Sequence, residues 1–209
     1  KDDFLGTSAK LSTREGNVIF LNDVLEKSVE KTLEIINERN STLENKEIVA
    51  KEVGIGAVIF QELFNTRIKD YSFDWNNVLN FEGETGPYVQ YSAARAYSIL
   101  EKNDFYSKIN NIDISKFSNY EMNVDELALV KSIYKFEDIL LDSAKKYEPS
   151  ILARYITEVA KLFNKFYNSC PINNQEENIK EFRLVLTYCS RLLIEIGLGL
   201  LGIDTPKKM

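Results

Sequence analysis

The stretch Gly83-Glu84-Thr85-Gly86-Pro87-Tyr88-Val89-Gln90-Tyr91 has the composition of a turn that leads directly into a helix. Glycine supplies the backbone freedom that a turn needs, and proline is favoured at the first position of a helix. The helix is predicted to run from Tyr88 to about Lys102. We therefore place a domain boundary at this turn, with residues 1–84 before it and residues 85–209 after it.

The rest of the chain also consists of long periodic segments separated by few helix breakers. Only 9 glycines and 4 prolines occur in 209 residues, which is typical of an all-helical protein. The sequence predicts an all-α fold: a bundle of about four helices preceded by a mostly helical N-terminal segment. The other helices are predicted at about 22–39, 46–65, 124–147, 149–168 and 178–201.

Several local features refine this prediction. Asn22 or Asp23 is expected to cap the first helix, and Asp125 the helix that begins near 124. Residues 18–21 are expected to form a brief strand or the start of a helix, residues 68–75 to be extended or irregular, and residues 103–123 to form a loop. Gly54 and Gly56 lie inside a predicted helix, where they are expected to allow another helix or backbone to approach closely.

Composition excludes several classes of protein. The chain has 26 Lys and Arg against 32 Asp and Glu, a net charge of -6, which argues against a globally basic nucleic-acid binder but not against a local basic face. It has no histidine, which excludes Ser-His-Asp, Cys-His and His-ligated metal chemistry within this chain. No apolar run is long enough to span a membrane, and no secretory signal is recognised. Cys170 and Cys189 are therefore expected to be reduced thiols rather than a disulfide.

The first candidate site is a glycine-flanked polar loop near the N-terminus. Lys10, Ser12, Thr13 and Arg14 carry donors suited to a phosphate group. A short polar stretch of this kind is more often an ordinary exposed loop, so the signal is weak by itself.

The second candidate site lies at the start of the helix that follows Pro87. Tyr88 and Tyr91 are one turn apart, with Gln90 and Arg95 nearby. Aromatic rings that stack on unpaired bases, with arginine against the phosphates, are a common way to recognise single-stranded RNA loops. The alternative is that the tyrosines pack half-buried with their hydroxyls at the surface.

Two further segments carry polar or aromatic groups at ends of predicted elements. In Leu162-Phe163-Asn164-Lys165-Phe166-Tyr167-Asn168, both phenylalanines continue the core stripe of Leu152, Tyr155 and Val159, whereas Tyr167 points elsewhere beside Asn164. The tail after Gly202, which ends in Lys207-Lys208-Met209, has the composition of a solvated end.

Taken together and in this order, these stretches resemble the C-terminal portion of an arginyl-tRNA synthetase, a class I aminoacyl-tRNA synthetase. Leu11 to Ile19 is similar to that family's form of the class I signature loop. The resemblance continues, in order, through Phe73-Asp74-Trp75, through Phe81-Glu82-Gly83-Glu84-Thr85-Gly86-Pro87-Tyr88-Val89-Gln90-Tyr91 with Arg95, through Phe163-Asn164-Lys165-Phe166-Tyr167, and through Leu200-Leu201-Gly202-Ile203 with Pro206 and Met209.

The resemblance implies functions that spacing alone does not. Lys10, Ser12, Thr13 and Arg14 match the ATP-binding signature loop, although Arg14 replaces a class-wide lysine and Leu11 the usual Met. Residues 1–84 correspond to the signature loop and a helical region that contacts the tRNA stem, and residues 85–209 to the anticodon-binding helical bundle. The expected tRNA-binding residues are Tyr88, Gln90, Tyr91, Arg95, Asn164, Tyr167 and Met209.

The parent enzyme implied by the resemblance joins arginine to tRNA(Arg) through an arginyl-adenylate, using ATP and Mg²⁺, in the cytoplasm. The nucleotide-binding fold and the histidine-containing motif of that family are expected upstream, so this polypeptide alone is expected to contain no catalytic residue and to show no ATP–pyrophosphate exchange. We expect no metal site, no membrane contact and no DNA partner.

Two other classes of function remain open at this point. One is a stand-alone helical RNA-binding or protein-interaction module related to the anticodon-binding domain. The other is a helical scaffold that uses Gly54 and Gly56 for packing. The stretch Lys10 to Asn17 favours the synthetase, because a free-standing bundle does not need an ATP loop.

Overall fold

The computed structural model describes residues 20–209, and this part of the chain is helical without any strand, as the sequence predicts. The α-helices are α1 (Leu21–Arg39), α2 (Lys46–Phe64), α3 (Trp75–Val78), α4 (Gly86–Lys102), α5 (Phe105–Lys108), α6 (Val124–Tyr134), α7 (Phe136–Lys146), α8 (Pro149–Ser169) and α9 (Glu177–Leu200). Two short 3₁₀ helices, η2 (Ile109–Asn111) and η3 (Ile114–Phe117), lie between α5 and α6. In the described residues, no helix is long and apolar enough to cross a membrane.

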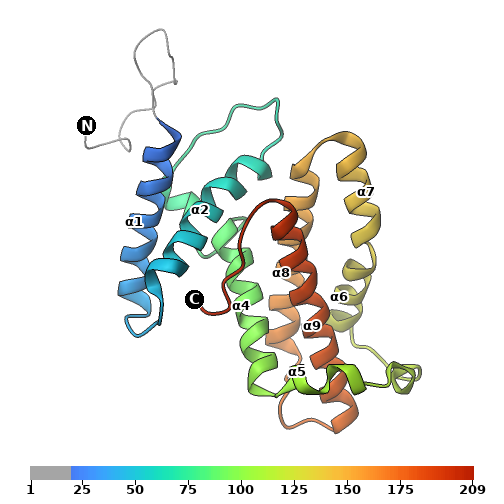
Figure 1. Ribbon diagram of the computed structural model, residues 1–209. Helices are drawn as coiled ribbons and strands as arrows, with labels where there is room; N and C mark the ends of the chain where they lie inside the picture. The colour runs from blue at the N-terminus through green and yellow to red at the C-terminus, as the bar shows by residue number, and fades with distance from the viewer. Residues whose placement is uncertain (1–19) are drawn as a thin grey trace.

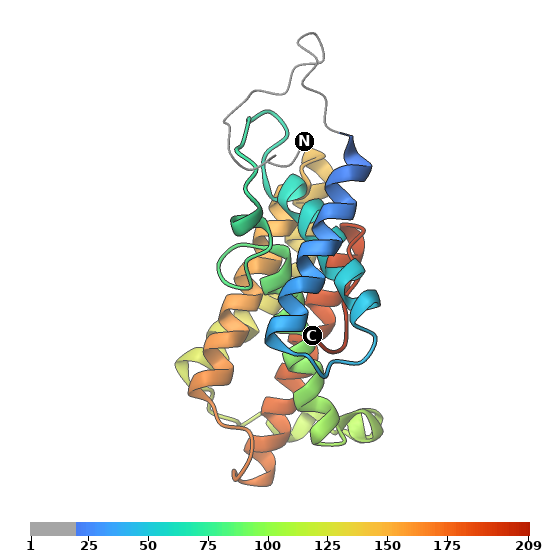
Figure 2. The same ribbon diagram turned by 90° about the vertical axis from the view of Figure 1, so that its left-hand side faces the viewer.

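The centre of the molecule is formed by α4, α8 and α9, which run side by side (Figures 1 and 2). The α8 helix buries the stripe that its periodicity predicts, because Leu152, Val159, Phe163 and Phe166 all belong to the main hydrophobic cluster. The α6 and α7 helices pack on α8, on the side away from α1 (Figure 1). Each helix of the bundle therefore supplies one apolar stripe to a shared core.

The α1–α2 hairpin packs against the other side of this bundle, through α2 (Figure 1). A Cβ atom at Gly54 would lie 2.8 Å from the backbone carbonyl atoms of Ser28, so only glycine permits this approach of α1 to α2. A Cβ at Gly56 would lie 2.9 Å from both Gln90 Nε2 and Ile203 Cγ2. The predicted role of both glycines in close packing is confirmed.

The predicted single helix over residues 124–147 is wrong, because two helices, α6 and α7, meet at Lys135. Near this break, the carbonyl of Ser132 accepts hydrogen bonds from the Lys135 amide (3.1 Å) and from the Tyr155 hydroxyl (2.6 Å). Phe136 then packs against Tyr155, with ring centroids 6.2 Å apart. A tertiary contact with α8 therefore accompanies the break, and local periodicity does not encode it.

Other boundaries also differ from the predicted ones. The α6 helix is capped by Asn123, in a capping box with Glu126, rather than by Asp125. The N-cap of α1 is Phe20, which makes no side-chain cap, rather than Asn22 or Asp23. Residues 68–74 are irregular, as predicted, and α3 begins at Trp75, whereas the predicted loop over residues 103–123 contains α5, η2 and η3. Both Cys170 and Cys189 are free thiols, as expected.

Candidate functional site

A pocket of about 550 Å³ lies where α1, α4, α8 and the C-terminal tail converge. It is lined by Ile35, Ile36, Arg39, Asn40, Phe81, Glu82, Tyr88, Tyr91, Arg95, Asn164 and Met209. Five of the seven residues predicted to bind tRNA are among them: Tyr88, Tyr91, Arg95, Asn164 and Met209. Folding thus brings together residues that are up to 121 positions apart in the sequence (209 − 88).

The guanidinium group of Arg95 lies between two tyrosine rings. Its Cζ atom is 4.9 Å from the ring centroid of Tyr91, on the same helix, and 5.3 Å from that of Tyr167, near the end of α8. The Tyr91 and Tyr167 side chains are exposed at 38% and 40%, so both rings are accessible at the surface. Tyr167 therefore lies next to the pocket and contacts its lining residue Arg95, although Tyr167 is not itself a lining residue.

Asn164 connects the polar groups of this site. Its Oδ1 accepts a hydrogen bond from Arg95 Nη1 (2.5 Å), and its Nδ2 donates to the Tyr88 hydroxyl (3.0 Å) and to Ser92 Oγ (2.8 Å). Ser92 in turn donates to the Tyr88 backbone carbonyl. One amide from α8 thereby fixes the orientation of three side chains from α4.

Gln90 is completely buried and does not offer its side chain to a ligand at the surface. Its Nε2 donates to the backbone carbonyls of Glu52 (3.2 Å) and Asp204 (2.8 Å). These bonds tie the C-terminal tail to α2 and α4.

Met209, at the end of that tail, packs against the cluster of Ile36, Val49, Ala50 and Val53, and its carbonyl accepts a hydrogen bond from Asn40 Nδ2 at 3.5 Å. The geometry thus places Gln90 behind the pocket, where it holds the segment that carries Met209.

Arg39, Asn40 and Phe81 line the pocket, but sequence reasoning did not identify them. Arg39 ends α1, with its Cζ atom 5.4 Å from the ring centroid of Phe81. Phe81 meets Tyr91 edge to face, with ring centroids 6.5 Å apart. Phe81 lies two residues before Gly83, next to the Gly83–Tyr91 stretch that the sequence analysis singles out. No local sequence pattern identifies Arg39 as a candidate site residue. Lys10, Ser12, Thr13 and Arg14 lie outside the described residues.

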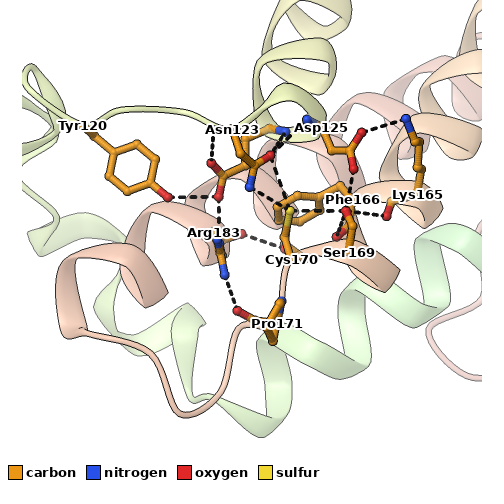
Figure 3. A network of polar contacts seen from close by, with 11 residues as sticks. Tyr120, Asn123, Asp125, Lys165, Phe166, Ser169, Cys170, Pro171 and Arg183 are labelled. Atoms are coloured by element: carbon orange, nitrogen blue, oxygen red, sulfur yellow. Dashed lines mark hydrogen bonds and ion pairs between the residues drawn. The ribbon is translucent and has the colours of Figure 1, made fainter.

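A polar network supports the end of α8 that carries Tyr167 (Figure 3). Lys165 Nζ lies 2.8 Å from Asp125 Oδ1, and Ser169 Oγ donates to Asp125 Oδ2 at 2.7 Å. Hydrogen bonds from Lys165 and Ser169 lower the pKa of Asp125 below its usual value. Charged contacts with the start of α6 therefore brace the last turns of α8.

The same network contains a buried ion pair between α6 and α9. Arg183 Nε donates to Glu126 Oε1 at 2.7 Å, and the Glu126 side chain is only 1% exposed. Glu126 also accepts from the Tyr120 hydroxyl (2.9 Å) and from the Asn123 amide (2.9 Å), so its charge is well compensated. Burial, together with the bond to Glu126, raises the pKa of Tyr120 to about 12.

Comparisons with known families give two matches along the chain. Residues 89–209 match the DALR anticodon binding domain, and residues 4–75 match the catalytic domain of tRNA synthetases class I (R). Among curated proteins, the chain is 50% identical to an arginine–tRNA ligase of Halothermothrix orenii over 201 residues, which covers 95% of this chain and 34% of that protein. It is 54% identical to the arginine–tRNA ligase of Clostridium kluyveri over 202 residues, covering 96% of this chain and 35% of that protein. The chain thus spans about a third of the length of these relatives.

Solved structures show the same fold. The arginyl-tRNA synthetase of Thermus thermophilus matches with a TM-score of 0.82 and 31% identity, over 92% of this chain and 32% of that chain. The arginyl-tRNA synthetase of Plasmodium falciparum matches in fold with a TM-score of 0.76 and 24% identity, over 92% of this chain and 34% of that chain. Both alignments leave about two thirds of the longer protein without a counterpart here.

Proposed function

Because the chain belongs to the DALR anticodon-binding domain family, we propose that it is the C-terminal, tRNA-binding part of an arginine–tRNA ligase. The observation that carries this proposal is the pocket itself. It gathers Tyr88, Tyr91, Arg95 and Asn164 from two helices and Met209 from the tail, at the positions that the resemblance to arginyl-tRNA synthetases implies. The proposed ligand is the anticodon loop of tRNA(Arg).

The chemistry of these side chains suits unpaired nucleotides. The exposed rings of Tyr91 and Tyr167 offer faces on which a base can stack. Arg95 presents a fixed guanidinium that can contact a phosphate, because its contacts within the described residues are with the Asn164 amide and two tyrosine rings and not with a carboxylate. Asn164 and the Tyr88 hydroxyl can hydrogen-bond to a base edge once a ligand displaces their mutual contact. The chain has a net charge of -6, which repels RNA as a whole. In this proposal, stacking on the tyrosine rings and the local positive charge of Arg39 and Arg95 outweigh that repulsion.

For the parent enzyme, we propose the charging of tRNA(Arg) with arginine, using ATP and Mg²⁺ in the cytoplasm. In this proposal Lys10, Ser12, Thr13 and Arg14 belong to the ATP-binding loop, and residues 1–84 contact the stem and inner bend of the tRNA. The match of residues 4–75 to a class I synthetase catalytic domain supports a synthetase over a stand-alone RNA-binding module. The partner within the enzyme is its own catalytic domain.

Direct binding measurements test the proposal. The chain is titrated with a tRNA(Arg) transcript and with the same transcript carrying an unrelated anticodon loop. We expect tighter binding of the unaltered tRNA(Arg), and an affinity that falls as salt rises because phosphate contacts release counterions. Equal affinity for the two transcripts, or no binding of either, would contradict an anticodon-binding role.

A further inference from the structure

The pocket contains a second arginine-on-ring unit besides the one formed by Arg95 and Tyr91. Arg39 lies over Phe81 with its Cζ atom 5.4 Å from the ring centroid, and Arg95 lies over Tyr91 at 4.9 Å. The two units meet where the Phe81 and Tyr91 rings contact each other at an interplanar angle of 82°. Two cations and two rings in mutual contact thus line a single pocket.

Neither guanidinium is neutralised within the described residues. Arg39 is solvent-exposed and takes part in no ion pair there, and Arg95 donates a hydrogen bond to the neutral amide of Asn164. Among the described lining residues, Glu82 alone is acidic. In an acidic chain, a pocket whose lining has two arginines outside any ion pair and a single acidic side chain favours an anionic ligand.

Arg39 and Phe81 lie outside the segment that matches the anticodon-binding domain, residues 89–209. Both nevertheless line the pocket together with that domain's residues, and Phe81 packs against the same buried cluster as Met209, namely Ile36, Val49, Ala50 and Val53. The matched domain on its own therefore supplies only part of the pocket.

We infer that Arg39 and Phe81 are further RNA-binding residues: Phe81 stacks on an unpaired base, and Arg39 contacts the phosphate beside it. This inference rests on the proposed function and extends it, because it assigns part of the RNA-binding pocket to the end of α1, which carries Arg39, and to the segment between α3 and α4, which carries Phe81. A stacked guanidinium keeps its edge N–H groups free to donate to phosphate oxygens. The two arginine-on-ring units then hold consecutive parts of one single-stranded segment.

Arg39→Gln in the 209-residue chain tests the phosphate contact, with an anticodon stem–loop RNA of tRNA(Arg) as the probe. The slope of log K against log salt is expected to become shallower by about 0.7–0.9, the value for one phosphate contact. Arg154→Gln is the matched control. Arg154 is also exposed and lies 5.4 Å over a phenylalanine ring, Phe64, but it is not in the pocket.

Phe81→Leu and Phe81→Tyr test the stacking contact without leaving a large cavity. Phe81→Leu keeps an apolar side chain but removes the ring, so binding is expected to weaken by roughly fivefold or more, whereas Phe81→Tyr keeps the ring and binds like the parent. Circular dichroism and thermal unfolding show whether each variant is folded.

The outcomes separate the two proposals. The further inference is wrong, and the proposed function stands, if the parent chain binds the stem–loop but the variants do not differ from their controls. In that case Arg39→Gln has the same slope of log K against log salt as Arg154→Gln, and folded Phe81→Leu has the same affinity as Phe81→Tyr. If the parent chain does not bind the stem–loop, the proposed function fails and this inference fails with it.

Discussion

At the scale of single residues, the site depends on how one arginine is held. Arg95 is held by Asn164 and lies between Tyr91 and Tyr167, so a guanidinium occupies the space between the two rings. A base that stacks on either ring makes its contact beside a charge that is already oriented. Preorganisation of this kind lowers the ordering cost of binding.

Tyr167→Ala is expected to weaken binding of tRNA(Arg) by about 1–3 kcal/mol, because it removes a stacking face. Tyr167→Phe keeps the ring and is expected to bind within a few-fold of the parent. Both affinities are measured by fluorescence anisotropy with labelled RNA. Unchanged affinity in a folded Tyr167→Ala variant removes this residue from the site.

Gln90→Met tests the assignment of Gln90 to the tail rather than to the ligand. The substitution removes the donor to the carbonyls of Glu52 and Asp204 at nearly constant volume, so stability is expected to fall by about 1–3 kcal/mol. Amide hydrogen exchange is expected to speed up in residues 203–209. An unchanged exchange rate in this tail, with weaker RNA binding, would instead indicate direct contact of Gln90 with RNA.

Residue spacing explains both the successes and the failures of sequence reasoning at the site. Tyr88, Tyr91 and Arg95 follow helical spacing, so one face of α4 could be predicted. Gln90 is their neighbour in sequence, but at about 100° per residue it points to another side of the helix, where it is buried. Arg39 joins the site only through tertiary packing of α1, which no local pattern reveals, whereas Phe81 lies just before the Gly83–Tyr91 stretch.

At the scale of elements, close packing of helices determines which positions tolerate a side chain. Gly197 and Gly199 lie two residues apart in α9, yet a Cβ at Gly197 would lie within 2.4 Å of Ile156 Cγ2, and a Cβ at Gly199 would meet nothing within 4 Å. Within one helix, Gly197 is thus a position without room for a methyl group, and Gly199 is its control with room for one.

Gly197→Ala is expected to destabilise the chain by about 1–3 kcal/mol, because the added methyl group forces α8 and α9 apart. Gly199→Ala is expected to stabilise it by about 0.5–1 kcal/mol through helix propensity. Urea unfolding of both variants measures the difference. Equal effects of the two substitutions would show that α8 and α9 are not packed as described.

The buried Glu126–Arg183 ion pair stabilises the contact between α6 and α9. Glu126→Ala leaves Arg183 and the Tyr120 hydroxyl without their buried partner, so a loss of about 3–5 kcal/mol is expected. Asp142→Ala, which breaks the exposed Lys146–Asp142 pair, is expected to cost about 0.3–0.5 kcal/mol. Thermal or urea unfolding distinguishes them, and comparable losses would contradict the burial of the first pair.

The elements themselves were largely predictable, and the errors have different causes. The stripe on α8 and the helices α2, α4 and α9 follow from periodicity and from Gly and Pro punctuation. The break between α6 and α7 lies near a hydrogen bond from Tyr155, and the cap of α6 belongs to a network that reaches α9. The break near Lys135 is accompanied by a partner distant in sequence, whereas the capping box of Asn123 and Glu126 is a local pattern in which Asn123, not Asp125, is the cap.

At the scale of the whole molecule, the half-buried Tyr155 makes the free energy of unfolding depend on pH in the alkaline range. Burial raises the pKa of Tyr155 to about 12, above the ordinary value of 10.0 that it has when unfolded. The unfolded chain therefore loses this proton first, so the contribution is complete below about pH 10 and is lost as pH rises towards 12.

Tyr155→Phe removes this titration, although it also removes the hydrogen bond to Ser132. The variant is expected to be less stable by about 1 kcal/mol near neutral pH, but to lose stability less steeply from about pH 10 to about pH 12. Urea midpoints across that range measure both effects. Parallel pH profiles for the parent and the variant would contradict the raised pKa.

The central claim is that unpaired bases of the tRNA(Arg) anticodon loop stack at the pocket between α1, α4 and α8, including on the exposed ring of Tyr167 beside Arg95. It is tested most directly with an anticodon stem–loop RNA that carries the fluorescent base 2-aminopurine in its loop. We predict that the emission is quenched when the chain binds, that Tyr167→Ala abolishes this quenching, and that Arg154→Gln retains it. Emission that changes equally in all three proteins, or changes only when the probe is in the stem, would contradict the claim.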